Sequence, residues 1–307
     1  MTTDVDLTVD GGRRVRIRST GPLDAPTIVY FHGTPDSRLT IDICAGLPTS
    51  TAVRLVAFDR PGYGGSEFTP FGLQSVARDT DVVLDALGIG RASVLGQSGG
   101  GPFALACAAE LGDRVTGVGV ASGPGSIVDV PGAIDELEDV DRQGLALIGT
   151  DNEAAARWFA AGFEPMAGLP QADDETIRSI MRQILSTDDA LSLPGVADGL
   201  VAGMREAMRQ GTDGCAWDNV AWVGPWATDL SAVTAPTWLW YGSDDPLAPL
   251  SHGERLLERL PNAALVVRPG EGHLGIYTHW DEIASTLAAT RSPRPALRPA
   301  RTRPAPA

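Results

Sequence analysis

The chain has 307 residues, of which 43% are hydrophobic and 21% are charged, so it can bury a substantial core and is not a disordered chain. Its 24 basic residues are all Arg, which excludes chemistry that needs a lysine amine, such as a Schiff base or the P-loop grip on a phosphate. The formal net charge of −15 argues against a surface that binds nucleic acid or an anionic membrane.

Short β-branched segments alternate with helical patterns in the first part of the chain. Strands are predicted at residues 15–19, 27–31, 55–58, 92–95 and 115–121, and helices at 73–87 and 99–111. The later strands are apolar at nearly every position, as strands covered on both faces must be. This pattern predicts an α/β fold with a mainly parallel sheet flanked by helices, and an antiparallel edge among the earliest strands is an open option.

A block without strand patterns follows, at residues 125–225. It contains helical stretches near 133–148, 153–167, 174–185 and 197–210, and alternation then resumes at 237–241, 251–260, 264–267 and 278–289. A helical block between two α/β portions predicts an inserted lid. We therefore expect a core made of residues 1–124 and 226–290, with an all-helical cap at 125–225.

The last segment, residues 291–307, holds five Arg, five Pro and no acid. Such a segment cannot bury enough apolar surface to order itself, so it is predicted to be a disordered tail. The three cysteines show neither a disulfide framework nor zinc-ligand spacing, and no metal site is expected. No secretion signal and no membrane-length apolar run is present, so we expect a soluble, cytoplasmic protein, with its oligomeric state open.

The strongest local motif is Gly96-Gln97-Ser98-Gly99-Gly100, which follows a predicted strand and opens a predicted helix. This is the G-x-S-x-G nucleophile elbow in its required strand–turn–helix context. Side chains at positions 96 and 100 would collide with the neighbouring strand or helix, and the tight turn lifts the serine hydroxyl clear of the sheet. Ser98 is therefore the predicted nucleophile.

A serine nucleophile needs a base that is held by a third group. Of the four histidines, His273 lies in a loop beyond the last predicted strand, where the carboxyl ends of the strands converge on the Ser98 turn. Asp245, at the end of the penultimate strand, is the predicted third member, and the adjacent Asp244 remains the alternative.

Several motifs together resemble the α/β-hydrolase fold superfamily. They are the H-G-x-P turn at 32–35, D-R-P-G-Y-G-x-S at 59–66, the elbow, G-x-x-D-x-x-x-P at 242–249 and the final G-x-G-H at 270–273. The resemblance implies an oxyanion hole formed by the backbone N–H groups of Thr34 and Gly99. It also implies that His32 orients its own turn rather than carrying a proton, and that Asp59 and Arg60 brace a nearby loop.

The resulting hypothesis is a cofactor-independent serine esterase with a helical cap. It cleaves a carboxylic ester, lactone or thioester of a small, partly apolar molecule through an acyl-enzyme. The alternatives are a lyase or cofactor-free oxygenase with His273 as its base, and a ligand-binding protein without useful turnover. Four of the five methionines and several aromatic residues of segment 125–225 either roof a pocket or only pack the lid onto the sheet.

Overall fold

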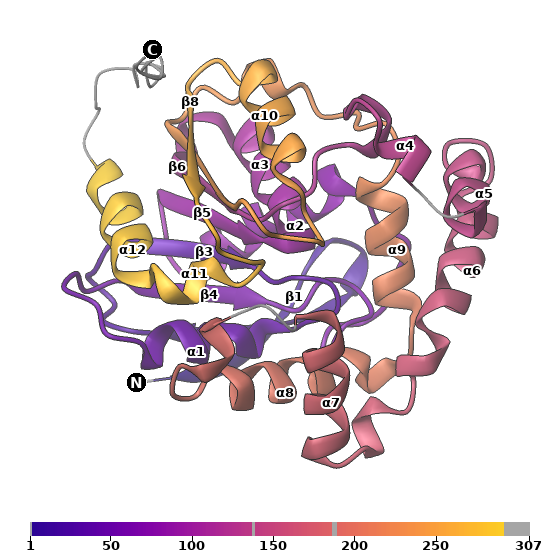
Figure 1. Cartoon of the computed structure of the whole chain (residues 1–307). Helices are drawn as coiled ribbons and strands as arrows, with labels where there is room; N and C mark the ends of the chain where they lie inside the picture. The colour runs from indigo at the N-terminus through magenta and orange to yellow at the C-terminus, as the bar shows by residue number, and fades with distance from the viewer. Residues whose placement is uncertain (1, 137–138, 186–188, 292–307) are drawn as a thin grey trace.

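A computed structural model describes residues 2–136, 139–185 and 189–291 of the chain. Its centre is one eight-stranded sheet with the strand order β1-β2-β4-β3-β5-β6-β7-β8 (Figure 1). The strands are β1 (Thr3–Thr8), β2 (Arg14–Thr20), β3 (Thr27–Phe31), β4 (Arg54–Phe58), β5 (Ala92–Gln97), β6 (Val115–Ala121), β7 (Thr237–Gly242) and β8 (Ala263–Arg268). The β1–β2 and β2–β4 pairs are antiparallel, and every other neighbouring pair is parallel. The predicted sheet and its antiparallel edge are thus confirmed.

Helices surround the sheet and account for most of the remaining elements. They are α1 (Ile41–Gly46), α2 (Leu73–Ala86), α3 (Gly101–Leu111), α4 (Ala133–Glu136), α5 (Asp139–Leu147), α6 (Asn152–Phe163), α7 (Asp174–Ile184), α8 (Val196–Ala207), α9 (Asp213–Trp222), α10 (Leu250–Arg259), α11 (Gly275–Thr278) and α12 (Trp280–Ala288). The sequence patterns missed β1, α1 and α9. The stretch predicted over 133–148 corresponds to α4 and α5, the one predicted over 278–289 corresponds to α12, and α11 was also missed.

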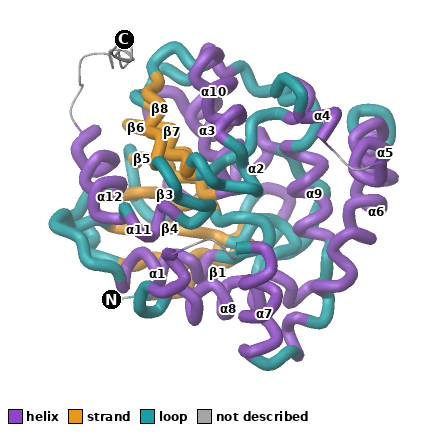
Figure 2. The backbone as a smooth tube through the Cα atoms, in the orientation of Figure 1, coloured by secondary structure: helices purple, strands orange, loops and turns teal. Residues whose placement is uncertain are grey.

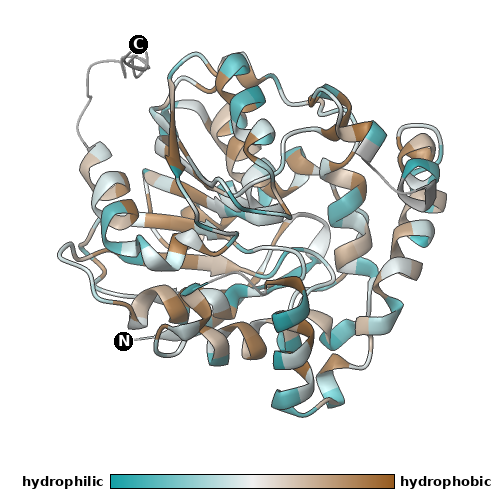
Figure 3. Ribbon diagram, in the orientation of Figure 1, coloured by the Kyte–Doolittle hydropathy of each residue, from teal (hydrophilic) through white to brown (hydrophobic). Residues whose placement is uncertain are grey.

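The two faces of the sheet are covered by different helices, as Figures 1 and 2 show. Residues of β3 alternate between the two cores, with Ile28 and Tyr30 in one and Val29 and Phe31 in the other. The first core includes α1 and α12, and the second includes α2, α3 and α10. Figure 3 shows hydrophobic colour concentrated on the strands inside these layers.

The chain between β6 and β7, residues 122–236, is a helical insert that carries α4 to α9. The described residues of this insert form no strand, in agreement with the predicted all-helical composition. Helix α8 shares an apolar core with α1, while α6 and α9 form a smaller cluster around Phe159 and Val220. The insert therefore packs on the sheet domain through more than one contact. Its role as a lid, and the domain boundaries at 124 and 226, stay predictions.

The described part of the chain ends with Thr290 and Arg291 after α12. The Thr290 hydroxyl bonds to Ser93 Oγ at 2.8 Å and to the Leu287 carbonyl at 2.7 Å, so the end of α12 is tied to β5. Of the tail predicted at 291–307, residues 292–307 lie outside the described residues. Within the described ranges, no helix has the length and apolar character needed to cross a membrane.

Candidate active site

Ser98 occupies a sharp turn between β5 and α3. Its φ is +52°, in the left-handed region that side chains rarely adopt, and it is the one residue of the 96–100 turn that is not buried. A Cβ placed on Gly96 would lie 2.6 Å from Gly101 Cα, and one placed on Gly100 would lie 2.7 Å from the carbonyl carbon of Phe31. Both positions therefore require glycine because the helix start and strand β3 approach too closely for a side chain.

A cavity of about 470 Å³ opens beside this turn at the carboxyl ends of the parallel strands. Ser98 and His273 both line it, although 174 residues separate them in the sequence, and so do Thr34, Gln97 and Gly99. The structure therefore brings the predicted nucleophile, base and oxyanion-hole residues to one cavity.

The imidazole of His273 is paired with Asp245. Nδ1 of His273 lies 2.9 and 3.0 Å from the two carboxylate oxygens of Asp245, and both residues are buried. The Asp245 carboxylate also accepts hydrogen bonds from the backbone N–H groups of Leu247 and Ala248. Burial acts to raise the pKa of Asp245, but His273 and these two N–H groups outweigh it and hold the pKa below its ordinary value.

Of the two adjacent carboxylates, the structure places Asp245 against the histidine and Asp244 on the surface. Asp244 is exposed and accepts a hydrogen bond from the hydroxyl of Ser243 at 2.7 Å. A carboxylate bound to Nδ1 keeps the proton on that nitrogen, which leaves Nε2 as the acceptor. The geometry therefore favours Asp245 over Asp244.

The other three histidines have different partners. His32 is fully buried, its Nδ1 contacts the carbonyl of Gly33 at 2.9 Å, and burial together with Arg60 lowers its pKa well below the ordinary value. His279 pairs with Glu271 at 2.7 Å, and His252 accepts a hydrogen bond from the backbone N–H of Gly125 at 3.0 Å. The buried, neutral state of His32 agrees with the predicted orienting role in its own turn.

Thr34 and Gly99 lie side by side at the cavity. A Cβ placed on Gly99 would be 3.1 Å from Cβ of Thr34 and closer still to its hydroxyl. A Cβ placed on Gly33 would be 3.0 Å from Oε1 of Gln97, so this turn also packs tightly on the elbow. The absence of side chains at 33 and 99 lets the two backbone segments approach each other.

A buried carboxylate that the sequence patterns did not single out holds the Thr34 turn in place. Asp218 of α9 has no exposed surface and accepts hydrogen bonds from Thr34 Oγ1 at 2.6 Å and Tyr63 OH at 2.5 Å. It also forms an ion pair with Arg60, whose Nε and Nη2 lie 2.8 and 2.5 Å from the two oxygens. We call this group, Thr34, Arg60, Tyr63 and Asp218, the Asp218 cluster.

Arg60 extends the Asp218 cluster to the backbone of the histidine turn. Its guanidinium donates to the carbonyls of His32 at 2.7 Å and Gly33 at 3.1 Å. Burial acts to lower the pKa of Arg60, but the charge and hydrogen bonds of Asp218 raise it above the ordinary value. Arg60 therefore stays charged, and it braces the turn as the family resemblance implied.

Asp59 braces a different part of the same region. It accepts from the backbone N–H and the guanidinium of Arg38 at 2.8 and 2.7 Å, and from the N–H of Gly65 at 2.8 Å. Arg38 also pairs at 2.7 Å with Glu206 of α8. Both α8 and α9 of the insert are thus joined to the sheet domain by ion pairs beside the candidate site.

The walls of the cavity are mostly apolar and come largely from the insert. The sequence analysis left open whether the methionine and aromatic residues of the insert line a pocket or only pack against the sheet. In the structure, some of them line the cavity and others do not. Those that line the cavity are Phe159, Phe163, Met166, Met181, Met204 and Trp222. Trp158, Met208, Trp217 and Trp226 do not line it.

The charged lining of the cavity is acidic. Asp36 lines it and is 4% exposed, with the backbone N–H of Ser37 bonded to Oδ1 at 2.7 Å. Burial raises the pKa of Asp36 to about 7. Among the residues that the structure describes, no Arg lines this cavity. The basic side chains at the cavity are therefore the imidazoles of His252 and His273, and an anionic group of a ligand would find no guanidinium there.

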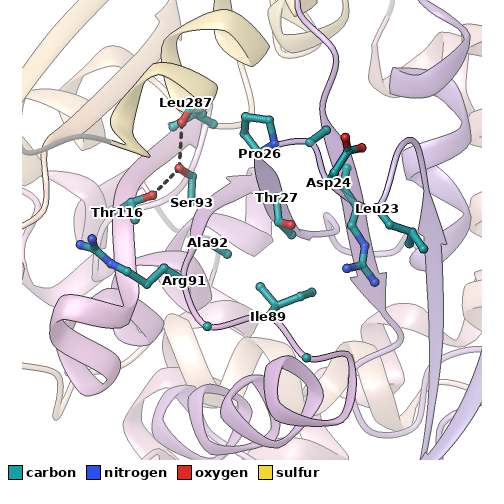
Figure 4. A pocket seen from close by; sticks show the side chains of 14 residues that line it. Leu23, Asp24, Pro26, Thr27, Ile89, Arg91, Ala92, Ser93, Thr116 and Leu287 are labelled. Carbon is teal, nitrogen blue, oxygen red and sulfur yellow. Dashed lines mark hydrogen bonds between the residues drawn. The ribbon is translucent and has the colours of Figure 1, made fainter.

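A second cavity, of about 330 Å³, lies at the opposite end of the sheet (Figure 4). It is lined by Thr27, Ala92 and Thr116, at the amino ends of β3, β5 and β6, and by Ser93 and Arg91. Ligands of parallel α/β sheets bind at the carboxyl ends of the strands, so this cavity is not the candidate active site. Across residues 2–136, 139–185 and 189–291, no group of three or more His, Cys, Asp or Glu could hold a metal ion.

The fold, the elbow and the histidine–carboxylate pair define a class of protein, and comparison with known sequences agrees. The model of the α/β hydrolase fold family matches residues 26–279, and the chain belongs to this family. Over 240 residues it is 28% identical to a 2-hydroxy-6-oxo-6-phenylhexa-2,4-dienoate hydrolase of Burkholderia cepacia, covering 74% of this chain and 73% of the relative. Over 255 residues it is 26% identical to a poly(3-hydroxyalkanoate) depolymerase of Ectopseudomonas oleovorans, covering 80% of each chain.

Solved structures show the same architecture. A thermophilic esterase from Thermogutta terrifontis matches with a TM-score of 0.66 and 21% identity, over 94% of this chain and all of that one. At this identity the likeness shows the fold alone. The family and the two curated relatives nevertheless support hydrolysis as the class of reaction.

Proposed function

We propose that this protein is a serine hydrolase that cleaves an ester, lactone or thioester of a small, partly apolar molecule through an acyl-enzyme. The observation that carries the proposal is the strained Ser98 turn facing a cavity that is also lined by His273, whose imidazole is paired with Asp245. A serine whose backbone adopts the left-handed conformation is strained, and this strain costs conformational free energy. Such strain persists only where the surrounding structure enforces it, most often at functional sites.

In the proposed mechanism, Ser98 Oγ attacks the substrate carbonyl while Nε2 of His273 accepts the serine proton. His273 then donates this proton to the leaving oxygen or sulfur, and the carbonyl double bond re-forms in the acyl-enzyme. Asp245 orients the imidazole and stabilises its charged form, and the N–H groups of Thr34 and Gly99 stabilise the oxyanion. Water, activated by His273, hydrolyses the acyl-enzyme. These steps need no metal or cofactor.

The substrate class follows from the cavity and its cover. Aromatic and methionine side chains of the insert favour an aliphatic or aromatic acyl or alkyl group, with the insert acting as a cap. The acidic lining disfavours an anionic group inside the cavity. We therefore propose an uncharged ester or lactone as substrate, rather than a dicarboxylate.

The proposal is tested with Ser98→Ala, His273→Ala and the double variant on p-nitrophenyl esters. Because the two residues act as a unit, each single variant should lose on the order of a millionfold in kcat and the double variant little more. A fluorophosphonate should label Ser98 stoichiometrically, with burst release of p-nitrophenol. Activity retained in Ser98→Ala would instead support a lyase or oxygenase with His273 as base, and acylation without deacylation would support a ligand-binding protein.

The assignment of the acid has a matched pair of variants. Asp245→Asn should lower kcat by about 10⁴-fold because the amide favours the wrong tautomer of His273. Asp244→Asn should leave kcat close to that of the parent protein, since Asp244 is exposed and does not contact the imidazole. The reverse result would reassign the acid to Asp244.

A further inference from the structure

The indole N–H of Trp222 is a buried donor without a partner. Nε1 of Trp222 is buried in this structure and has no hydrogen-bond acceptor within the described part of the chain. Buried polar groups are nearly always paired in folded proteins, because an unmade hydrogen bond costs free energy. The indole N–H of Trp222 is therefore available to donate a hydrogen bond to an acceptor on a bound molecule.

This donor lies at the oxyanion end of the candidate site. Trp222 lines the same cavity as Ser98 and His273. A Cβ placed on Gly99 would be 3.5 Å from Nε1 of Trp222 and in contact with the Thr34 side chain. The indole N–H is thus next to the two residues whose backbone N–H groups we assign to the oxyanion hole.

The position of Trp222 is set by contacts that leave its N–H free. Asp218 lies four residues earlier on α9, on the same face of the helix, and is fixed by Arg60 and by Thr34 itself. The backbone carbonyl of Trp222 accepts a hydrogen bond from Nε1 of Trp226 at 2.7 Å. The Asp218 cluster therefore fixes α9 against the Thr34 turn one helical turn before Trp222.

We propose that Nε1–H of Trp222 donates a hydrogen bond to the acyl oxygen of the substrate as this oxygen becomes the oxyanion. Trp222 then acts with the N–H groups of Thr34 and Gly99 as a third donor, delivered by the helical insert. This proposal rests on the proposed hydrolytic function. It makes the insert a part of the catalytic site as well as its cover.

Trp222→Phe tests this proposal because it keeps an aromatic ring and removes only the donor. We expect kcat/KM on p-nitrophenyl butyrate to fall roughly 10- to 1000-fold, mostly in kcat, as for the loss of one oxyanion donor. The matched control is Trp217→Phe on the same helix, whose ring does not line the cavity and whose kcat/KM should stay within about twofold. An unchanged kcat/KM in Trp222→Phe would overturn the proposal.

Binding of a transition-state analogue gives a second measurement. An alkyl boronic acid that forms a tetrahedral adduct with Ser98 should bind more weakly to Trp222→Phe by about the same factor as kcat/KM falls. In the parent protein, this adduct should shift one of the seven indole N–H resonances downfield, which needs no folded variant. No shifted indole resonance would contradict the proposal.

The two proposals fail in different ways. If Ser98→Ala stays active, the hydrolytic function itself is wrong. If Ser98→Ala is inactive while Trp222→Phe keeps full activity and full affinity for the boronic acid, only the role of Trp222 is wrong.

Discussion

Asp36 is a buried carboxyl group at the wall of an apolar cavity, and no ion pair joins it to a basic side chain in the described part of the chain. Helix α8 covers it so closely that a Cβ on Gly203 would touch its carboxylate. Burial is the largest cause of its raised pKa of about 7, against hydrogen bonds from Thr40 and Ser37 that lower it. Near neutral pH, the Asp36 side chain in the cavity wall therefore changes between its neutral and its anionic form.

The raised pKa of Asp36 predicts a loss of stability as pH increases. The pKa of this carboxyl group is near its ordinary value of 3.8 in the unfolded chain and about 7 in the folded protein. The stability that the neutral carboxyl group contributes to the fold is fully present below the unfolded pKa and is lost as pH rises to about 7. Asp36→Asn should therefore become more stable relative to the parent protein between pH 4 and 7, by a few kcal/mol at most, since one pKa unit corresponds to about 1.4 kcal/mol.

Thermal unfolding midpoints of both proteins across this pH range measure the effect. Asp244→Asn is the control, since it makes the same substitution at an exposed carboxylate outside the cavity. A pH-independent difference for Asp36→Asn would show that Asp36 is not the titrating group. In the same variant, kcat/KM for an anionic hemi-ester should rise relative to that for a neutral ester.

Helix α9 is the element that joins the insert to the candidate site. Its Asp218 accepts four hydrogen bonds from three side chains of the sheet domain and is completely buried. Removing one partner of a buried ion pair leaves the other charge uncompensated, and that penalty exceeds the net value of the pair. The position of α9, and with it the Thr34 turn, therefore depends on a single carboxylate.

Asp218→Asn should destabilise the protein by about 3–5 kcal/mol, because Arg60 loses its counter-charge in a site without water. Tyr63→Phe removes only one of the four donors and should cost about 1 kcal/mol. The measurements are denaturant midpoints and, for the folded variants, kcat on a p-nitrophenyl ester. The control is Asp213→Asn, an exposed residue in the first turn of the same helix. Equal, small losses in all three variants would contradict the cluster's role.

At the scale of the whole molecule, hydrogen bonds tie the end of α12 to the sheet. Thr290 is 5% exposed and its hydroxyl bonds to both Ser93 and Thr116, which belong to neighbouring parallel strands β5 and β6. The basic segment that follows carries five Arg and no acid, against a net charge of −20 for residues 1–290. We therefore predict that the boundary between body and tail lies just after Thr290.

Two truncated chains test where this boundary lies. A chain that ends at Arg291 should keep the unfolding temperature and kcat/KM of the full-length protein, because the removed residues have low apolar content. A chain that ends at Ala288 loses the Thr290 hydrogen bonds and should be less stable by about 1–3 kcal/mol. If both chains unfold at the temperature of the full-length protein, Thr290 does not close the body.

What the sequence predicted well depends on local rules. The strands at 27–31 and 115–121 agree with β3 and β6 because burial on both faces leaves a continuous apolar run. The glycines at 96 and 100 pointed to the elbow because close backbone approach excludes a side chain. Strand β1 was not predicted because its residues are mostly exposed and polar, so its sequence shows no pattern of buried positions.

The sequence by itself predicted the family from its motifs, the sheet from periodicity, Ser98 from the glycines of its turn, and His273 from its loop beyond the last strand. Tertiary structure alone decided which carboxylate meets His273, which methionines and aromatic residues line the cavity, and that Asp218 pairs with Arg60. Their partners lie 28 residues apart in the first case and 158 in the last, and no local pattern encodes such a contact. Packing of the insert on the sheet pairs Asp218 with Arg60, and the loops after β7 and β8 bring Asp245 to His273. A buried charge is stable only where the fold places a partner beside it.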